Sequence, residues 1–213
     1  MIVFNRVCKN GLKNLSFNIN RGEFVYIYDA SERVLEVLRD LMSGKEKPES
    51  GVIRWLNCYN FNPELLKGDI GVVFKDNILL PDRTLAENLQ FILEIKGLNR
   101  AHFNLRLIRV LNIVGLEGYQ NFRPGELLGH QLVRANIAQA LLNYPSILIL
   151  EDPSSRLDEV NSQAIIHLLK KINRLSLTVI LLSSDKRLVL GDDIRVIRLE
   201  KGRRNEKKKG FYA

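Results

Sequence analysis

Short apolar runs and amphipathic stretches alternate along this chain. Residues 23–28 and 178–182 are the strongest runs, and their frequent β-branched and aromatic side chains favour buried strands. An Asn10-Gly11 pair predicts a turn in the N-terminal region. Shorter runs predict further strands, the last of them at an edge of the sheet: residues 3–4, 15–19, 51–56, 70–74, 147–150 and 195–199.

Apolar residues recur at helical spacing between these runs. Helices are expected at residues 32–42, 85–114, 129–142 and 159–175, with Gly44 ending the first and a break near Gly97 in the second. Strands that alternate with helices predict a mainly parallel sheet covered by helices on both faces. The helical block at residues 85–142 interrupts this alternation and predicts a separate helical lobe.

Size and composition suit one large α/β domain, or two lobes that share a core. The chain has 213 residues, 46% of them hydrophobic, and no apolar run approaches the roughly 20 residues of a membrane span. The first residues contain no basic leader followed by an apolar stretch, so we expect no signal peptide and a cytoplasmic location. Cys8 and Cys58 are too few for a disulfide scaffold and form no metal-binding pattern, so we interpret them as packed thiols.

The positive charge of the chain is concentrated at its end. The net charge is +8, and residues 201–209 carry much of the excess. A basic run of this kind is either a solvated tail or a surface for anionic lipid, nucleic acid or an acidic partner. Only Phe211 and Tyr212 accompany the charges, which makes a nucleic-acid surface the weakest of these interpretations.

Three blocks of sequence resemble ATP-binding cassette (ABC) ATPases in the order and spacing of that family. The blocks are residues 70–88, 131–145 and 147–158, and the resemblance extends over nearly the whole chain. In the first block, the run Leu-Leu-Pro-Asp-Arg-Thr followed by Glu-Asn is typical of the FtsE family of cell-division proteins.

The resemblance implies an α/β fold of the P-loop NTPase type. A single ABC domain over residues 1–213 would contain a mainly parallel core sheet, an antiparallel β lobe and a helical subdomain. Residues 1–84 and 143–200 would form the core with the β lobe, residues 85–142 the helical subdomain, and residues 201–213 a basic C-terminal tail.

ABC ATPases carry a G-x-x-G-x-G-K-[ST] loop whose backbone N–H groups, lysine and hydroxyl bind phosphates and Mg²⁺. Here all three glycines are missing, Leu35 replaces the lysine, and Glu36 replaces the hydroxyl. Side chains with Cβ atoms disfavour the positive-φ turns of such a loop, and three carboxylates would repel a triphosphate. We therefore predict a structural turn that caps a helix, in which nucleotide binding is not expected. The eight matching positions are Asp29, Ala30, Ser31, Glu32, Arg33, Val34, Leu35 and Glu36.

The other nucleotide-contacting positions implied by the resemblance are also altered. Lys75 replaces the Q-loop glutamine, and Ser184 replaces the switch histidine. Glu151-Asp152 inverts the Asp-Glu pair of the Walker B motif, although two carboxylates remain that are able to bind Mg²⁺ or polarise water. The turn at residues 8–11 lacks the aromatic residue that would stack on adenine.

The signature motif L-S-G-G-Q is also incomplete. It corresponds to Leu127, Leu128, Gly129, His130 and Gln131, with Leu128 in place of the serine. The remaining histidines, His102 and His167, fall at no catalytic position. We therefore expect no catalytic residue and no metal site.

One functional segment of the resembled family is retained. FtsE-like proteins receive the coupling helix of their membrane partner after the Q-loop, where this chain has Leu79, Leu80, Pro81, Asp82, Arg83 and Thr84. Thr84 and Glu87 also fit a capping box that begins a helix. Both interpretations of the segment stand together.

These features predict a pseudo-ATPase that docks an FtsX-like membrane protein on the inner face of the plasma membrane, in cell division or envelope remodelling. No cofactor is expected. The alternative is a divergent Mg-ATP hydrolase, as one half of an asymmetric ABC heterodimer, that uses Glu151 and Asp152. Expected partners are the membrane protein and a second ABC domain, with an anionic membrane surface as a further candidate for the tail.

Overall fold

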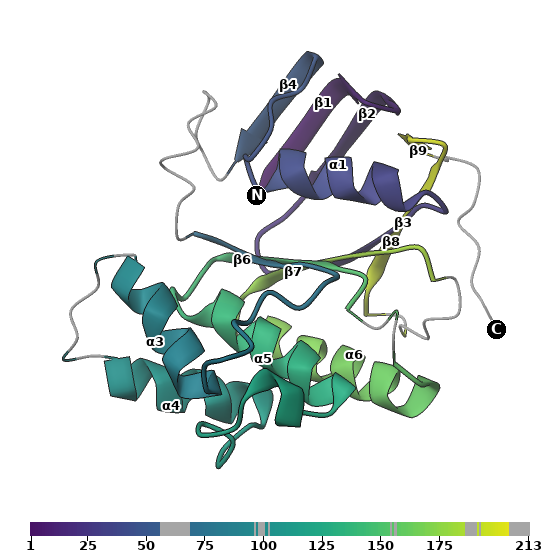
Figure 1. Ribbon diagram of the computed structural model, residues 1–213. Coiled ribbons are helices and arrows are strands. Elements are labelled where there is room, and N and C mark those ends of the chain that lie inside the picture. Colours follow the sequence, from purple (N-terminus) through teal and green to yellow (C-terminus); the bar gives the residue numbers. More distant parts are fainter. Residues whose placement is uncertain are drawn as a thin grey trace.

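The computed structural model describes residues 1–55, 69–95, 97, 101, 103–153, 155, 157–185, 191 and 193–204. Its strands form two sheets (Figure 1). The smaller sheet is antiparallel, with the order β2-β1-β4 (Leu12–Ile19, Ile2–Lys9 and Ser50–Trp55). The predicted Cys58 thiol lies outside the described residues.

The larger sheet has six strands in the order β5-β6-β7-β3-β8-β9. All neighbouring strands pair in parallel except β8 and β9, which are antiparallel. This confirms the predicted α/β fold with a mainly parallel core sheet and an antiparallel lobe. The strands are β5 (Ile70–Val73), β6 (Ile147–Glu151), β7 (Thr178–Ser183), β3 (Phe24–Tyr28), β8 (Arg195–Glu200) and β9 (Arg203–Arg204).

Strands β1 and β2 are longer than the sequence pattern predicts. They form a hairpin around the Asn10-Gly11 turn, where both residues have positive φ. The register of the hairpin shifts between Phe4 and Val7. Because a bulge of this kind adds residues to one strand and breaks the alternation of polar and apolar residues, the pattern alone missed the middle of β1.

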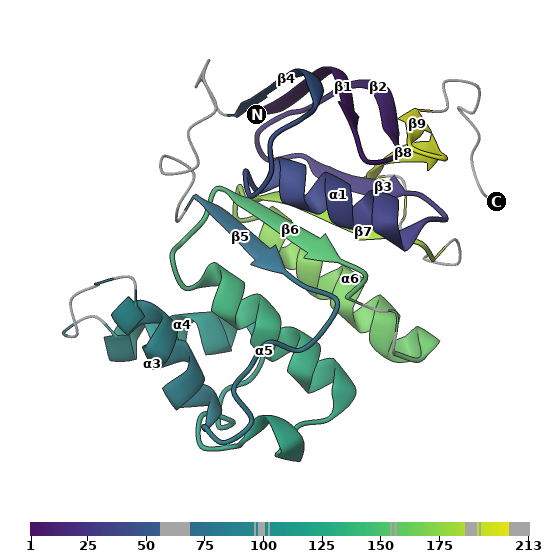
Figure 2. The same ribbon diagram turned by 45° about the horizontal axis from the view of Figure 1, so that its top comes forward.

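Helix α1 (Glu32–Met42) lies between the two sheets, as both views show (Figures 1 and 2). Its bounds agree with the prediction, and Gly44 follows it with a φ of 74°. The helix buries one apolar face against both sheets in a single cluster that also contains Phe4, Trp55 and Ile149.

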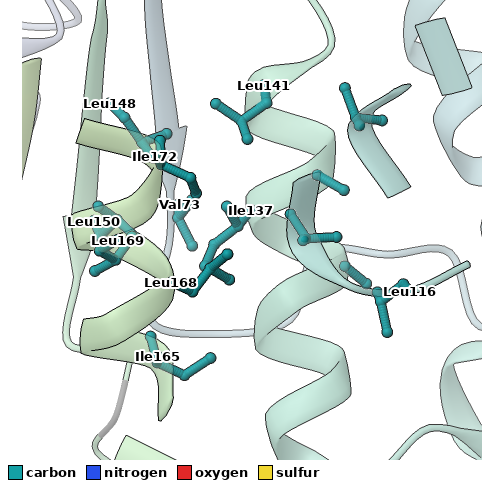
Figure 3. Packing of buried hydrophobic residues seen from close by; sticks show 14 of the residues in the cluster. Val73, Leu116, Ile137, Leu141, Leu148, Leu150, Ile165, Leu168, Leu169 and Ile172 are labelled. Carbon is teal, nitrogen blue, oxygen red and sulfur yellow. The ribbon is translucent and has the colours of Figure 1, made fainter. Parts of the chain in front are cut away.

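The opposite face of the central sheet is covered by α5 (Gly129–Leu141) and α6 (Glu159–Asn173), with α3 (Leu85–Ile95) and α4 (Phe103–Val114) beyond them (Figures 1 and 2). Figure 3 shows the second core cluster, in which Val73 and Leu150 of the sheet meet Ile137 of α5 and Leu169 of α6. Within the part of the chain that the structure describes, no helix is both long and apolar enough to cross a membrane.

Two predictions about the C-terminal region need correction. Strand β8 was predicted at the sheet edge, but it lies between β3 and β9. Residues 201–204 were assigned to the tail, but they form a turn and strand β9, which contacts β2. The turn before β9 depends on Gly202, which has a φ of 74°. A Cβ atom at this position would lie 2.0 Å from the carbonyl oxygen of Gly11, so the close approach of the two segments requires a glycine.

Candidate functional site

The carboxyl ends of β3, β5, β6 and β7 meet at one edge of the central sheet, beside the N-terminus of α1. This edge is where open parallel sheets bind ligands. The predicted phosphate-loop segment and the Walker-type pair lie at this edge.

The phosphate-loop segment forms a turn and the first helical turn of α1. Residues 29–36 are all described, and none has a positive φ. Helix α1 begins at Glu32 with Ser31 as the N-cap, although the serine side chain makes no capping hydrogen bond. Leu35, at the lysine position, is 1% exposed and packs in the core. The segment is therefore a turn followed by a helix, without the side-chain cap from Ser31.

The carboxylate of Asp29 was predicted to face the phosphate position, but it is buried within the protein. It is 1% exposed, and its Oδ1 accepts a hydrogen bond from Ser31 N at 2.8 Å. Its Oδ2 accepts from Gly202 N at 3.2 Å. Asp29 therefore ties the turn to the β8–β9 connection, and the carboxylates that face solvent in this segment are those of Glu32 and Glu36.

Lys75 bridges the Q-loop position and the phosphate-loop position. Its Nζ donates a hydrogen bond to Oε1 of Glu32 at 2.6 Å. This hydrogen bond is the main cause that raises the pKa of Lys75, and the charges of Asp152 and Glu151 act in the same direction. A cation is thus present at the site, but it is already paired with a side chain of the protein.

Arg39, which the sequence analysis missed, neutralises the first Walker B position. Its guanidinium pairs with the carboxylate of Glu151, which is 5% exposed, and with Oδ1 of Asp40 at 2.8 Å. Burial raises the pKa of Glu151, and Arg39 offsets only part of this effect. Burial acts to lower the pKa of Arg39, but its bonds to Asp40 and Glu151 raise it overall.

Asp152 occupies the position of the catalytic carboxylate and is engaged by two hydroxyl groups. Ser183 donates to its Oδ1, and Ser184, at the switch position, donates to its Oδ2 at 3.1 Å. Asp152 is 3% exposed and has a φ of 43°, a left-handed conformation that is uncommon outside glycine. Both carboxylates of the inverted pair are therefore hydrogen-bonded within the protein.

The signature position lies at the N-terminus of α5. Leu128 is 62% exposed, and its backbone N–H donates to Oε1 of Gln131 at 2.8 Å. Gly129 lies against Leu157, while His130 is half-buried. Helix α5 therefore presents a capped end with an apolar side chain where the family has a serine. His167 is exposed on α6, and His102 lies outside the described residues.

These contacts do not fit a Mg²⁺-nucleotide site. None of residues 29–36 has a positive φ, position 35 holds a buried leucine instead of a lysine, and the carboxylates of Glu151 and Asp152 are bonded internally. Within the described ranges, no group of three or more His, Cys, Asp or Glu side chains is placed to hold a metal ion.

Cys8 is half-buried, and its Sγ accepts a hydrogen bond from Asn14 N.

The predicted docking segment, residues 79–84, is a fixed loop before α3. Leu79 is buried, whereas Leu80 is 38% exposed and residues 81–83 are exposed. The predicted capping box is confirmed, because Thr84 N donates to Glu87 Oε2 at 2.7 Å and Glu87 N donates to Thr84 Oγ1 at 3.2 Å. We call residues 79–84 the docking loop.

Asn88, 4% exposed in α3, holds the docking loop and was not singled out from the sequence. Its Oδ1 accepts from Leu80 N at 2.7 Å, and its Nδ2 donates to Leu80 O at 3.1 Å. The same Nδ2 also contacts the carbonyl oxygens of Arg83 and Thr84. One buried amide therefore sets the path of the loop.

Replacing Asn88 by alanine is expected to lower the free energy of unfolding by about 1–3 kcal/mol, because the bonded backbone groups lose their partner. Urea unfolding measures this loss. The control is Asn112→Ala, at an exposed position of α4, which is expected to change stability by less than about 0.5 kcal/mol. Equal effects of the two substitutions would contradict the role given to Asn88.

The fold and the positions at the sheet edge define an ATP-binding cassette. The sequence matches the ABC transporter family over residues 12–155, and the chain belongs to that family. It is 32% identical over 208 residues to the cell division ATP-binding protein FtsE of Streptococcus pneumoniae serotype 2 (strain D39), a match that covers 95% of this chain and 90% of the relative. It is thus an FtsE-like cassette.

Solved structures of ABC cassettes have the same fold. The cbiO1 protein from Clostridium perfringens, part of the ABC transporter complex cbiONQ, superimposes with a TM-score of 0.87 at 25% identity, over 96% of this chain and 86% of that chain. The dimeric structure of the bacterial ABC transporter cassette MJ0796 gives a TM-score of 0.81 at 29% identity, over 99% and 100% of the two chains.

Proposed function

We propose that this chain is a pseudo-ATPase: an ABC cassette that neither binds Mg²⁺-ATP productively nor hydrolyses it. The proposal rests on one observation: the charged side chains that could bind a nucleotide or Mg²⁺ are already bonded to other side chains of the protein. Arg39 pairs with Glu151, two serines bond Asp152, and Lys75 pairs with Glu32. A nucleotide would have to break these bonds, and the turn before α1 offers no amide cradle in return.

The proposed role is that of a docking subunit for an FtsX-like integral membrane protein, on the cytoplasmic face, in cell division or envelope remodelling. The docking loop supports this role, because Asn88 holds it in one conformation with Leu80, Pro81 and Arg83 exposed. The similarity to FtsE supports the process. Dimerisation with itself or with another ABC domain, and contact of the basic tail with anionic lipid, belong to the same proposal.

Titration calorimetry with Mg²⁺-ATP tests the pseudo-ATPase directly. No saturable heat and no thermal stabilisation are expected at millimolar nucleotide, the upper range of ordinary KM values. Thermal stabilisation is an independent readout, because a ligand that binds the native state raises the unfolding temperature by mass action. Saturable binding with a matching rise in unfolding temperature would overturn the proposal.

Co-purification with the membrane partner tests docking. Binding is expected without nucleotide and is expected to fall at least tenfold on Leu80→Asp, because a charge would face the apolar contact, at a cost of about 1.4 kcal/mol or more. Leu105→Asp is the matched control, since Leu105 is 69% exposed on α4, outside the docking loop. A strict requirement for ATP would contradict the scaffold role.

The alternative, a slow hydrolase in an asymmetric pair, is favoured by one feature: the carboxylates of Glu151 and Asp152 persist side by side at the end of β6. Mixing this chain with an intact ABC partner distinguishes the two functions. Hydrolysis that disappears on Asp152→Asn in this chain, with the partner unchanged, would establish the alternative.

A further inference from the structure

Residues 74–84, which we call the joining segment, connect strand β5 to helix α3. On the core side, α1 holds the beginning of this segment twice. The guanidinium carbon of Arg39 lies 5.1 Å from the centre of the Phe74 ring, within the range of a cation–π contact. Lys75 Nζ lies 2.6 Å from Glu32 Oε1.

Toward α3, two buried amides, Asn136 of α5 and Asn88 of α3, hold the rest of the joining segment. Asn77 Oδ1 accepts from Asn136 Nδ2 of α5 at 3.1 Å and from Leu79 N at 3.2 Å. Asn88 of α3 bonds both backbone groups of Leu80. The joining segment is therefore tied to α1 at its beginning and to α5 and α3 along its remainder.

The two α1 side chains act from one face of the helix. Glu32 and Arg39 are separated by two helical turns, so they project in similar directions. Arg39 is itself fixed by Glu151 and Asp40, and Asp40 accepts a further bond from Lys45 Nζ at 3.1 Å. The helix thus presents an anion and an immobilised cation to the joining segment.

We propose that Glu32 and Arg39 form a built-in clamp that holds the joining segment against the core without any ligand. The clamp spans the same two regions, the turn before α1 and the segment after β5, between which the family would place its nucleotide. Its consequence is that the docking loop stays in one conformation whether or not ATP is present. The clamp is a property of this chain alone, whereas its use in partner binding rests on the proposed function.

The two contacts differ in their exposure to solvent. The side chains of Lys75 and Glu32 are 27% and 57% exposed, so their pair is screened, whereas that of Arg39 is only 12% exposed. Lys75→Ala is expected to speed amide hydrogen exchange at residues 76–80 by about two- to fivefold. Phe74→Leu keeps the apolar volume but removes the ring face, with an expected effect of similar size, about two- to fivefold.

Hydrogen exchange followed by mass spectrometry on the full chain tests the clamp. Lys170→Ala is the matched control, because Lys170 Nζ lies 2.6 Å from Asp193 Oδ1 with similar exposure, 21% and 60%, far from the joining segment in the sequence. It is expected to leave exchange at residues 74–84 unchanged. Glu32→Ala should match Lys75→Ala, and the double variant should exchange no faster than either one, because both remove the same contact.

Three results would overturn the clamp. The first is equal exchange in Lys75→Ala and in the Lys170 control, and the second is a multiplication of the two single effects in the double variant. The third is slower exchange at residues 74–84 of the wild type when Mg²⁺-ATP is added. Partner co-purification separates this failure from that of the proposed function. If Lys75→Ala exchanges faster but still binds the partner without nucleotide, the clamp is not needed for partner binding. The scaffold role would then stand. Intact protection without partner binding would refute docking and leave the clamp in place.

Discussion

Arg39→Met is expected to lower the free energy of unfolding by about 3–5 kcal/mol at pH 8, the usual result of removing one member of a buried ion pair. The reason is Glu151, which is 5% exposed and has Arg39 as its cation partner. Without the guanidinium, the carboxylate remains charged in the core beside Asp152. Urea unfolding at two pH values measures the effect.

The loss is expected to depend on pH with a defined sign. Burial already raises the pKa of Glu151 above its reference value of 4.5, and Arg39 opposes that rise. In Arg39→Met the native pKa therefore rises further, and at pH values between the unfolded and the native pKa the native state holds a proton that the unfolded chain has released. Stability then falls as the pH increases. The deficit should be smaller at pH 5 than at pH 8.

Two controls separate the ion pair from general disruption. Glu151→Gln is expected to cost less than Arg39→Met, because Arg39 keeps Asp40 at 2.8 Å and an amide oxygen is still able to accept its bond. The double variant Arg39→Met with Glu151→Met should recover most of the loss, since no buried charge is left unpaired. An Arg39→Met protein as stable as the wild type at both pH values would refute the pairing.

The strands and helices of the core could be predicted because their hydrophobic period is strong. Helix α1 was predicted with the bounds that the structure shows, since its buried positions repeat at helical spacing. The hairpin β1–β2 was predicted too short, because bulges interrupt the alternation. Strand β9 was missed, since two exposed arginines carry no apolar pattern, although they pair with Leu199 and Glu200 of β8.

The sequence indicated which residues lie at the candidate site, but not which of them bond to one another. Motif spacing located Lys75, Glu151 and the turn before α1. It did not indicate that Arg39 reaches Glu151, a residue 112 positions away, or that Asp29 turns toward Gly202. Such pairs depend on how α1 lies against β6, which is decided by packing of the whole core. The available signal was Arg39 itself, a cation on the helix that follows the phosphate-loop position.

Leu35→Lys restores the family's phosphate-binding lysine and is expected to destabilise the fold by at least about 3 kcal/mol, since a charge enters the core and leucine packing is lost. Leu35 is 1% exposed among apolar side chains of α1 and both sheets. Glu36→Lys is the control, because position 36 is exposed on the same helical turn, and it should change stability by less than about 1 kcal/mol.

The pH dependence of Leu35→Lys identifies the cause of its instability. Burial lowers the native pKa of a lysine below the unfolded value of about 10.4, so the variant should gain stability as the pH rises toward 10. A deficit that is the same at pH 7 and pH 10 would instead indicate lost packing alone. If the buried charge is the cause, restoring this lysine by itself unfolds the site instead of reviving it. A return to nucleotide binding would then require the turn, the core beneath it and the Arg39–Glu151 pair to change together.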